Sequence, residues 1–389
     1  MNFIKTPYLQ LPETDGITVM WETDVESTSK LMVWDTSAPA CGKVVYNPQG
    51  KAKVFSGEDG HMHKVKVTGL ESGKDYCYQA TSNTAETKVI SEFLVFRTKS
   101  QKEGSFSLAV TSEFVNGVFG SDYFGYWYHM PQIGKIVESI AAERPDFLLL
   151  VGDMVSDGRN RGEWDQYMFA PFQELFGNTP FYHCAGNHEQ HSDYMKLFLG
   201  TSEKGYYDFT YGCAHFIALD STQLVEHIMD EEGNYVSISL TQELTEDNPQ
   251  VRFLINSFKK SASKWKIVFF HYPPYIAASW QTAALRPLCR IFEEYDVDIV
   301  LNSHTIVYER SHPIRNDSID YSKGVRYIVA GGAGAVPEWF HHKKAWHTAK
   351  SRAVPHFVHI SVTPEHLELQ AIDLEGKLFD SLVIQKPDR

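Results

Sequence analysis

The chain has 389 residues, and at about 150 residues per domain this length predicts two or three domains. Its formal net charge is −13 and its pI is near 5.7, so its surface repels phosphate backbones, which argues against nonspecific nucleic-acid binding. Hydrophobic residues make up 43% and charged residues 22%, which is typical of a globular protein and excludes global disorder.

The first hundred residues have a strand pattern. Turn residues separate short alternating segments, which predicts a β-sandwich over residues 1–99, with strands at 16–23, 29–34, 63–67, 75–81 and 89–98. Trp21 is expected as the core tryptophan. The segment LESGKDYCY at 70–78 resembles the tyrosine corner of fibronectin type III and immunoglobulin-like domains. The polar run KSQKEG at 99–104 predicts a linker.

From residue 105 to residue 389, strands and helices alternate, which predicts an α/β domain whose sheets are covered by helices. The expected strands lie at 106–111, 147–151, 215–219, 265–270, 298–301 and 327–330, and the expected helices at 132–143, 249–260 and 282–295. Residues 357–385 are again strand-like. No internal repeat interrupts this pattern.

No membrane segment is predicted. The longest apolar runs, such as FLLLVG at 147–152, are far shorter than the ~20 residues that a span needs. The first ten residues lack the apolar stretch of a signal peptide. We therefore expect a cytoplasmic protein, or a secreted one if a leader was trimmed.

The cysteines argue against a disulfide framework or a zinc knuckle, because they are odd in number and contain no CxxC pair. Cys41 and Cys77 could pair within the first domain, but two separate buried thiols are the favoured interpretation. The full set is Cys41, Cys77, Cys184, Cys213 and Cys289.

Polar side chains follow four of the apolar strand segments, and these are Asp153, Asn187, His271 and His304. Ligands gather at the carboxyl ends of strands in an α/β sheet. One carboxylate, one amide oxygen and two imidazoles suit Mn, Fe, Zn or a similar ion. Taken singly, Asp153 could belong to a turn, Asn187 could cap a loop, and His271 could be a hydrogen-bonded core histidine. In this order and spacing, the four together predict a metal site.

These residues lie in motifs that resemble the calcineurin-like metallophosphoesterases and, within them, the purple acid phosphatases. The motifs are GD at 152–153, GNHE at 186–189, VFFH at 268–271 and HTIVYER at 304–310. The resemblance extends to PYLQ at 7–10, HFIALDS at 215–221 and GGAGA at 331–335, so it spans nearly the whole chain. It implies a β-sandwich followed by a four-layer α/β sandwich.

The resemblance also implies roles for the site residues. The family uses two metals bridged by a carboxylate and a water-derived hydroxide, and Asp153 would be that carboxylate. Asn187, His271 and His304 would complete one of the two sites. His188 would protonate the leaving oxygen and contact the phosphoryl group. The alternative for His188 is a histidine that only supports the ligands.

The departures from the family pattern fall on the other metal. Its first motif is Asp-x-His, or Asp-x-Gly in purple acid phosphatases, whereas this chain has Glu113 followed by Phe114 and Val115. The tyrosinate of purple acid phosphatases is replaced by Ser156, and the second histidine of the last motif by Ile306. Glu113 stays a candidate ligand or base. We therefore expect one tightly bound Mn, Fe or Zn, and at most a weakly held second cation such as Mg or Ca.

Other residues offer alternatives at this second site. The aromatic run at 123–128 is either a packed loop or a wall for an organic leaving group. The histidines after GGAGA belong either to a solvated loop or to a ligand-binding loop. Arg310 is either a cation at the site or part of a structural ion pair. The further candidates are Asp122, Asp157, Tyr308, His341, His342 and His347, with Arg159 and Arg161 as additional cations.

Three functions fit these observations. The first is a metal-dependent phosphoester hydrolase that acts on a small-molecule phosphoester and has no nucleic-acid or membrane partner. The second is a non-catalytic phosphoryl-ligand-binding or regulatory protein on the same scaffold. The third makes the sandwich a carbohydrate or adhesion module, and it has the least support because that domain is not basic and shows no recognisable motif.

Overall fold

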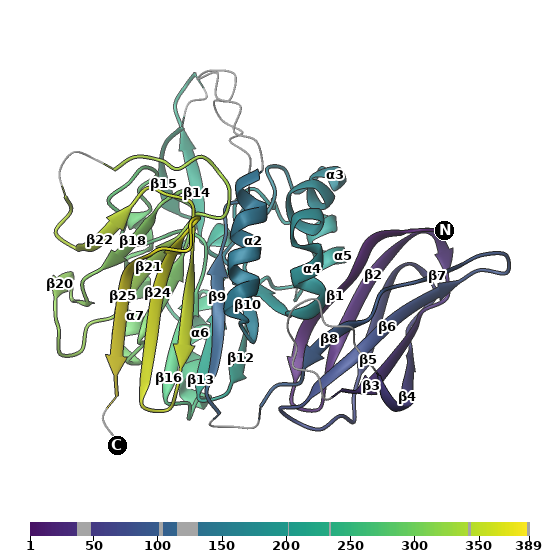
Figure 1. The fold of residues 1–389 in the computed structure, drawn as a ribbon. Helices are drawn as coiled ribbons and strands as arrows, with labels where there is room; N and C mark the ends of the chain where they lie inside the picture. Colours follow the sequence, from purple (N-terminus) through teal and green to yellow (C-terminus); the bar gives the residue numbers. More distant parts are fainter. Residues whose placement is uncertain are drawn as a thin grey trace.

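The computed structural model describes residues 1–36, 48–100, 104–114, 131–200, 202–232, 235–340 and 344–386. Within these ranges, a strand-rich N-terminal part is followed by a larger part in which two sheets pack between layers of helices (Figure 1). The predicted fold class, a β-sandwich followed by a four-layer α/β sandwich, is confirmed.

The N-terminal part has two sheets around one core. One sheet contains β1 (Phe3–Glu13), β2 (Gly16–Ser27) and β5 (Gly60–Val67), and the other contains β3 (Lys30–Asp35), β4 (Gln49–Ser56), β6 (Asp75–Asn83), β7 (Lys88–Ile90) and β8 (Leu94–Arg97). Trp21 is fully buried between them and donates from Nε1 to Ser82 Oγ at 2.9 Å. The Tyr76 hydroxyl accepts from Glu71 N at 2.9 Å, which is the contact of a tyrosine corner. Both expectations are confirmed.

The first sheet of the sandwich continues into a sheet of the larger part. The nine strands follow the order β25-β24-β23-β9-β10-β11-β1-β2-β5, and β1 meets β11 in parallel at Gln10 and Phe181. The six strands not yet given are β9 (Phe106–Thr111), β10 (Phe147–Leu150), β11 (Phe181–His183), β23 (His356–Val362), β24 (His366–Asp373) and β25 (Leu378–Gln385). The parallel trio β9, β10 and β11 points its carboxyl ends to one edge.

A second sheet of seven strands packs on the first, and the core between them is apolar and fully buried. Its order is β12-β13-β16-β17-β21-β18-β22, and β13, β16, β17 and β21 run parallel. The strands are β12 (Tyr207–Tyr211), β13 (Ala214–Ala218), β16 (Trp265–Phe269), β17 (Ile299–Asn302), β18 (Tyr308–Ser311), β21 (Arg326–Ala330) and β22 (Thr348–Arg352).

Helices cover the outer faces of both sheets. α2 (Pro131–Glu143), α4 (Ala170–Asn178) and α5 (Asp193–Leu199) pack on the nine-stranded sheet, and α6 (Pro249–Lys260) and α7 (Pro287–Glu294) pack on the seven-stranded sheet. The smaller elements are α3 (Arg161–Glu163), η1 (Trp164–Phe169), η2 (Ser221–Gln223), η3 (Ala283–Leu285) and the hairpins β14 (Val225–Met229) with β15 (Tyr235–Leu240) and β19 (Ile314–Arg315) with β20 (Ser318–Ile319). None of the helices in the described part of the chain combines the length and apolarity needed to cross a membrane.

Two predicted elements differ from the structure. The expected strand 89–98 is split into β7 and β8, because Ala80 N donates to the Ser91 side-chain oxygen at 3.0 Å, which interrupts the ladder with β6. The expected helix 282–295 begins only at Pro287, which lacks a backbone N–H and is suited to the first turn of a helix.

The described cysteines are buried thiols: Cys77, Cys184, Cys213 and Cys289. Cys41 lies outside the described residues, so its state stays a prediction.

Buried polar contacts join the sandwich to the helices of the larger part. Tyr8 donates to Phe198 O at 2.7 Å, and Tyr78 donates to Gly177 O at 2.6 Å. The Lys5 ammonium is fully buried and lies 2.7 Å from Glu22 Oε2 and 2.5 Å from Asp165 Oδ1. A buried ion pair of this kind is strongly destabilising when one partner is removed, because the other charge stays buried.

We therefore expect Lys5→Met to lower the free energy of unfolding by about 3 to 5 kcal/mol, measured by urea denaturation. Lys66→Met is the matched control, because the Lys66–Glu13 pair is exposed, and it should change stability by less than about 1 kcal/mol. Equal, small effects of both substitutions would contradict the assigned role of Lys5.

Candidate metal centre

The four predicted ligands come together where the carboxyl ends of the two sheets meet. Asp153 follows β10, and Asn187 lies in the loop after β11, so both come from the nine-stranded sheet. His271 follows β16 and His304 follows β17, so both come from the seven-stranded sheet. The predicted strand-end arrangement therefore assembles side chains from four strands and two sheets.

Two glycines allow the strand ends to approach this closely. Gly152 has a φ of +88°, and a Cβ there would lie 2.7 Å from both Gly186 N and His271 Nδ1. A Cβ on Gly186 would lie only 2.2 Å from Asp153 Oδ1. Any larger residue at either position would push the ligand loops apart.

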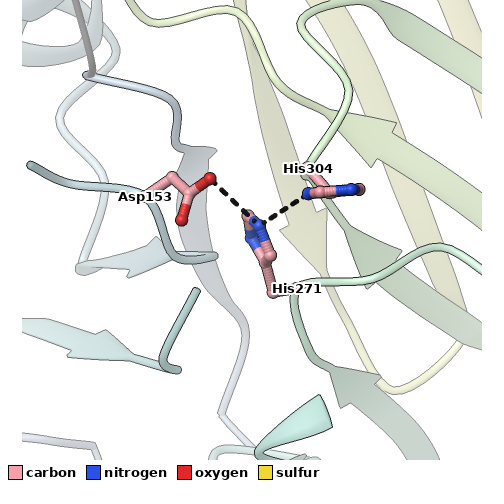
Figure 2. A group of neighbouring side chains, drawn as sticks. All are labelled: Asp153, His271 and His304. Atoms are coloured by element: carbon pink, nitrogen blue, oxygen red, sulfur yellow. Dashed lines mark hydrogen bonds and ion pairs between the residues drawn. The ribbon is translucent and has the colours of Figure 1, made fainter. Parts of the chain in front are cut away.

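The donor atoms surround Nε2 of His271. This nitrogen lies 3.2 Å from Asp153 Oδ2, 3.1 Å from Asn187 Oδ1 and 3.2 Å from His304 Nδ1. Figure 2 shows the Asp153 carboxylate and the His304 ring on either side of the His271 ring. In the described part of the chain, Asp153, His271 and His304 form the one group of three or more acidic, histidine or cysteine side chains whose ligand atoms all lie within 4.8 Å of one another.

Charge coupling within this group sets the protonation states. Burial lowers the pKa of His271, but the nearby Asp153 carboxylate outweighs it and raises that pKa to about 9. Burial raises the pKa of Asp153, but His271 outweighs it and holds the pKa below its usual range. Burial and the charge of His271 keep the pKa of His304 well below its usual range. The metal-free group is therefore an imidazolium with one carboxylate and one neutral imidazole.

His271 is oriented by its other ring nitrogen, because Nδ1 lies 2.9 Å from the carbonyl oxygen of Val151. The carbonyl can only accept, so Nδ1 carries a proton and Nε2 faces the other donor atoms.

His188 lies at the solvent side of the group. Its Nδ1 donates to Ser156 O at 2.7 Å, and its Nε2 lies 3.8 Å from Asp153 Oδ2. Its side chain is 18% exposed, whereas that of His271 is fully buried. The ring is therefore fixed at one nitrogen and presents the other to the site.

Glu189 is a structural residue of this site to which the sequence pattern assigned no role. Its carboxylate is fully buried and accepts backbone hydrogen bonds from Asp153 N at 2.9 Å, Met154 N at 2.6 Å and Gly186 N at 2.6 Å. Burial, together with the charge of Asp153, raises the pKa of Glu189 to about 7. The sequence feature that could have identified Glu189 is its position in the GNHE motif, two residues after Asn187.

Glu113 lies in a different environment from the four converging side chains. Its Oε1 accepts from Ser303 Oγ at 2.5 Å and from His304 N at 2.7 Å. Burial and the charge of Asp153 raise the pKa of Glu113 well above its usual range. The structure therefore gives this carboxylate hydrogen-bond partners in the His304 loop, and its predicted role as a ligand or base stays a prediction.

The candidates for a second cation that the structure describes have other partners. Asp157 pairs with Arg159, Tyr308 donates to Asp380, and His347 lies in the interior 3.4 Å from Glu309. Ser156, at the position of the family's tyrosinate, is a buried serine. Val115, Asp122, the aromatic run 123–128, His341 and His342 lie outside the described residues.

The three candidate arginines are engaged in ion pairs. Arg310 binds both carboxylate oxygens of Asp380, at 2.7 and 3.0 Å. Arg159 pairs with Asp157, and Arg161 pairs with Glu22. For Arg310, the structural alternative is the one that the structure supports.

Two aromatic rings flank His304, and the sequence pattern pointed to neither. The Tyr272 ring lies 4.5 Å from the His304 ring, and the Trp280 ring lies 6.5 Å from it, both measured between ring centroids. Tyr272 is buried, whereas Trp280 is exposed.

Comparison with known proteins agrees with this architecture. The family model of the calcineurin-like phosphoesterases matches residues 125–308, which include all four converging side chains and His188 but not Glu113. The model of the purple acid phosphatase N-terminal domain matches residues 4–98.

Individual relatives are distant. Purple acid phosphatase 13 of Arabidopsis thaliana is 24% identical over 75% of this chain and 58% of its own length. Probable inactive purple acid phosphatase 24 of the same plant is 24% identical over 50% of this chain and 36% of its own length. This chain thus spans only part of the curated relatives that it matches.

The fold likeness is closer than the sequence likeness. The structure of the purple acid phosphatase PPD1 from yellow lupin seeds superposes with a TM-score of 0.76, covering 97% of this chain and 74% of that one, at 17% identity. By these family models, the chain contains a purple acid phosphatase N-terminal domain over residues 4–98 and a calcineurin-like phosphoesterase domain over residues 125–308.

Proposed function

We propose that the protein is a metal-dependent phosphoester hydrolase that uses one tightly held metal ion. The observation that carries this proposal is the approach of Asp153, Asn187 and His304 to within 3.2 Å of His271 Nε2. These four polar side chains come from the ends of four strands in two sheets. A purely structural role would not require polar side chains to converge in this way.

The donor set fits a transition metal. One carboxylate oxygen, one amide oxygen and two imidazole nitrogens match the ligand preferences of Mn, Fe or Zn. When bound, such an ion supplies a Lewis acid for the phosphoryl oxygens and lowers the pKa of a coordinated water. Val151 O and the backbone amides held by Glu189 would keep the ligand loops in place around it.

We propose no step that depends on a second cation. Asp153 Oδ1 already accepts from His188 N at 3.0 Å, and Glu113 Oε1 already accepts two hydrogen bonds. Ile306 is half-buried and offers no ligand atom.

His188 is proposed as the general acid. Since Nδ1 is bound to Ser156 O, Nε2 is the nitrogen that can donate a proton to the leaving oxygen of a substrate. The substrate is proposed to be a small-molecule phosphoester, and neither a nucleic acid nor a membrane is proposed as a partner.

The alternative is a phosphoryl-ligand-binding protein without turnover. It is favoured by the loss of donors at the second site and by the name of the relative called a probable inactive purple acid phosphatase. The two proposals differ in whether bound phosphoester is hydrolysed.

We expect hydrolysis of 4-nitrophenyl phosphate by protein supplied with Mn, Zn, Fe or Mg, and a loss of at least about 100-fold in kcat/KM for His304→Ala. The reason is that the loss of one ligand weakens the electrostatic stabilisation of the transition state. His188→Ala should lower kcat by about 100- to 10,000-fold without loss of metal.

His61→Ala is the matched control, because His61 is an exposed histidine of the sandwich, and it should leave the rate unchanged. Full activity of both His271→Ala and His304→Ala would show that the site is wrongly assigned. Absence of turnover in the parent protein, with metal and phosphate still bound, would support the alternative.

Metal binding should release about one proton per ion at pH 7. His271 is protonated in the metal-free protein because its pKa is about 9, whereas Asp153 and His304 have lowered pKa values and have no proton to lose. The apparent affinity should therefore rise about tenfold per pH unit between pH 7 and pH 9.

This release can be measured by titration calorimetry of the same metal in two buffers with different ionisation enthalpies. His271→Ala should abolish the buffer dependence of any remaining binding heat. Binding without proton release at pH 7 would contradict the proposed charge on His271.

A further inference from the structure

Trp280 has an unusual backbone conformation next to the proposed metal ligands. Its φ is +56°, in the left-handed region that bulky side chains rarely occupy. Such conformations persist only where the surroundings enforce them, and they cluster at functional sites. The residue is also 43% exposed, so this conformation does not serve to bury the indole in the core.

Side-chain to backbone hydrogen bonds hold the loop that carries Trp280. Gln281 Nε2 donates to Ile276 O and to Ala278 O, each at 2.8 Å. Thr282 Oγ1 donates to Pro273 O, and Arg286 Nε donates to Pro274 O at 3.1 Å. These bonds connect the two ends of the loop, so its path from His271 to α7 is fixed.

The indole itself is fixed from the neighbouring segment. Trp280 Nε1 donates to Glu338 Oε1 at 3.1 Å, and Ala278 forms an antiparallel bridge with Phe340. Glu338 N in turn donates to Ile306 O at 3.0 Å, two residues beyond His304. The ring is therefore held in one orientation, with its centroid 6.5 Å from that of His304 and the two rings inclined by 61°.

We propose that Trp280 determines substrate specificity by binding the flat aromatic ester group of an aryl phosphate. This inference rests on the proposed function, because the metal ion that His304 helps to hold is taken to bind the phosphoryl group. An exposed, prepositioned indole beside such an anchor offers a face on which an aromatic ring can stack, at little entropic penalty. An alkyl ester of similar charge cannot make this contact.

The test uses phosphonates, which are not hydrolysed. Calorimetry of the metal-loaded protein should show phenylphosphonate binding about 3- to 10-fold more tightly than methylphosphonate, as expected for one aromatic pair. Trp280→Asn removes the ring but tolerates a positive φ, so the loop should remain folded. This variant should bind both phosphonates with the affinity that the parent has for methylphosphonate.

Two further variants serve as controls. Trp280→Phe keeps an aromatic face and loses the donor, so it should keep most of the preference for phenylphosphonate. Trp339→Ala removes an indole that is 73% exposed in the segment following Glu338, and it should change neither affinity. Melting temperatures of all variants check that the loop is intact.

The possible outcomes separate this inference from the proposed function. Equal affinities of the parent for the two phosphonates, or a preference that survives in Trp280→Asn, overturn the role of Trp280 while leaving the metal site intact. Failure of both phosphonates to bind overturns the binding of the phosphoryl group at the metal site and this inference with it. If the protein hydrolyses no phosphoester but prefers phenylphosphonate, and Trp280→Asn removes that preference, the result supports both the role of Trp280 and the alternative function as a phosphoryl-ligand-binding protein.

Discussion

The rest of the site depends on the convergence of three donor atoms on Nε2 of His271. That nitrogen is fixed because its partner Nδ1 donates to Val151 O, which belongs to the segment that leads to Asp153. The contact requires the nine-stranded and seven-stranded sheets to meet at their carboxyl ends, and the missing side chains of Gly152 and Gly186 permit it. The buried His271 imidazolium and the buried Asp153 carboxylate stabilise each other. Removal of either charge would leave the other buried without a partner.

Different hydrogen bonds hold the two halves of the candidate site. In one half, Asp153 Oδ1 accepts from His188 N and His271 Nδ1 donates to Val151 O, so backbone contacts set the direction of both side chains. In the other half, Glu113 accepts hydrogen bonds from Ser303 and from the backbone of His304, so it supports the neighbouring ligand loop. A carboxylate that holds this loop contributes to the first site through His304, whose own φ of +69° needs such support.

The sequence predicted the features that depend on local pattern. Strands such as β9 and helices such as α6 have clear periodicity and strong end signals, and their bounds agree with the prediction. β1 was missed because Pro7 and Pro12 interrupt its alternation, and its pairing with β11 joins residues about 170 positions apart. The contacts of Glu113 with Ser303, of Trp280 with Glu338 and of Glu189 with the backbone arise from tertiary packing, which no local pattern encodes.

The central claim is that the chain holds one metal ion on Asp153, Asn187, His271 and His304. The most direct test is elemental analysis of metal per chain, on protein purified without chelator and on His304→Ala purified in parallel. The account predicts one transition-metal ion per chain in the parent and a marked loss of it in the variant. Two ions per chain, or one ion that His304→Ala retains in full, would contradict it.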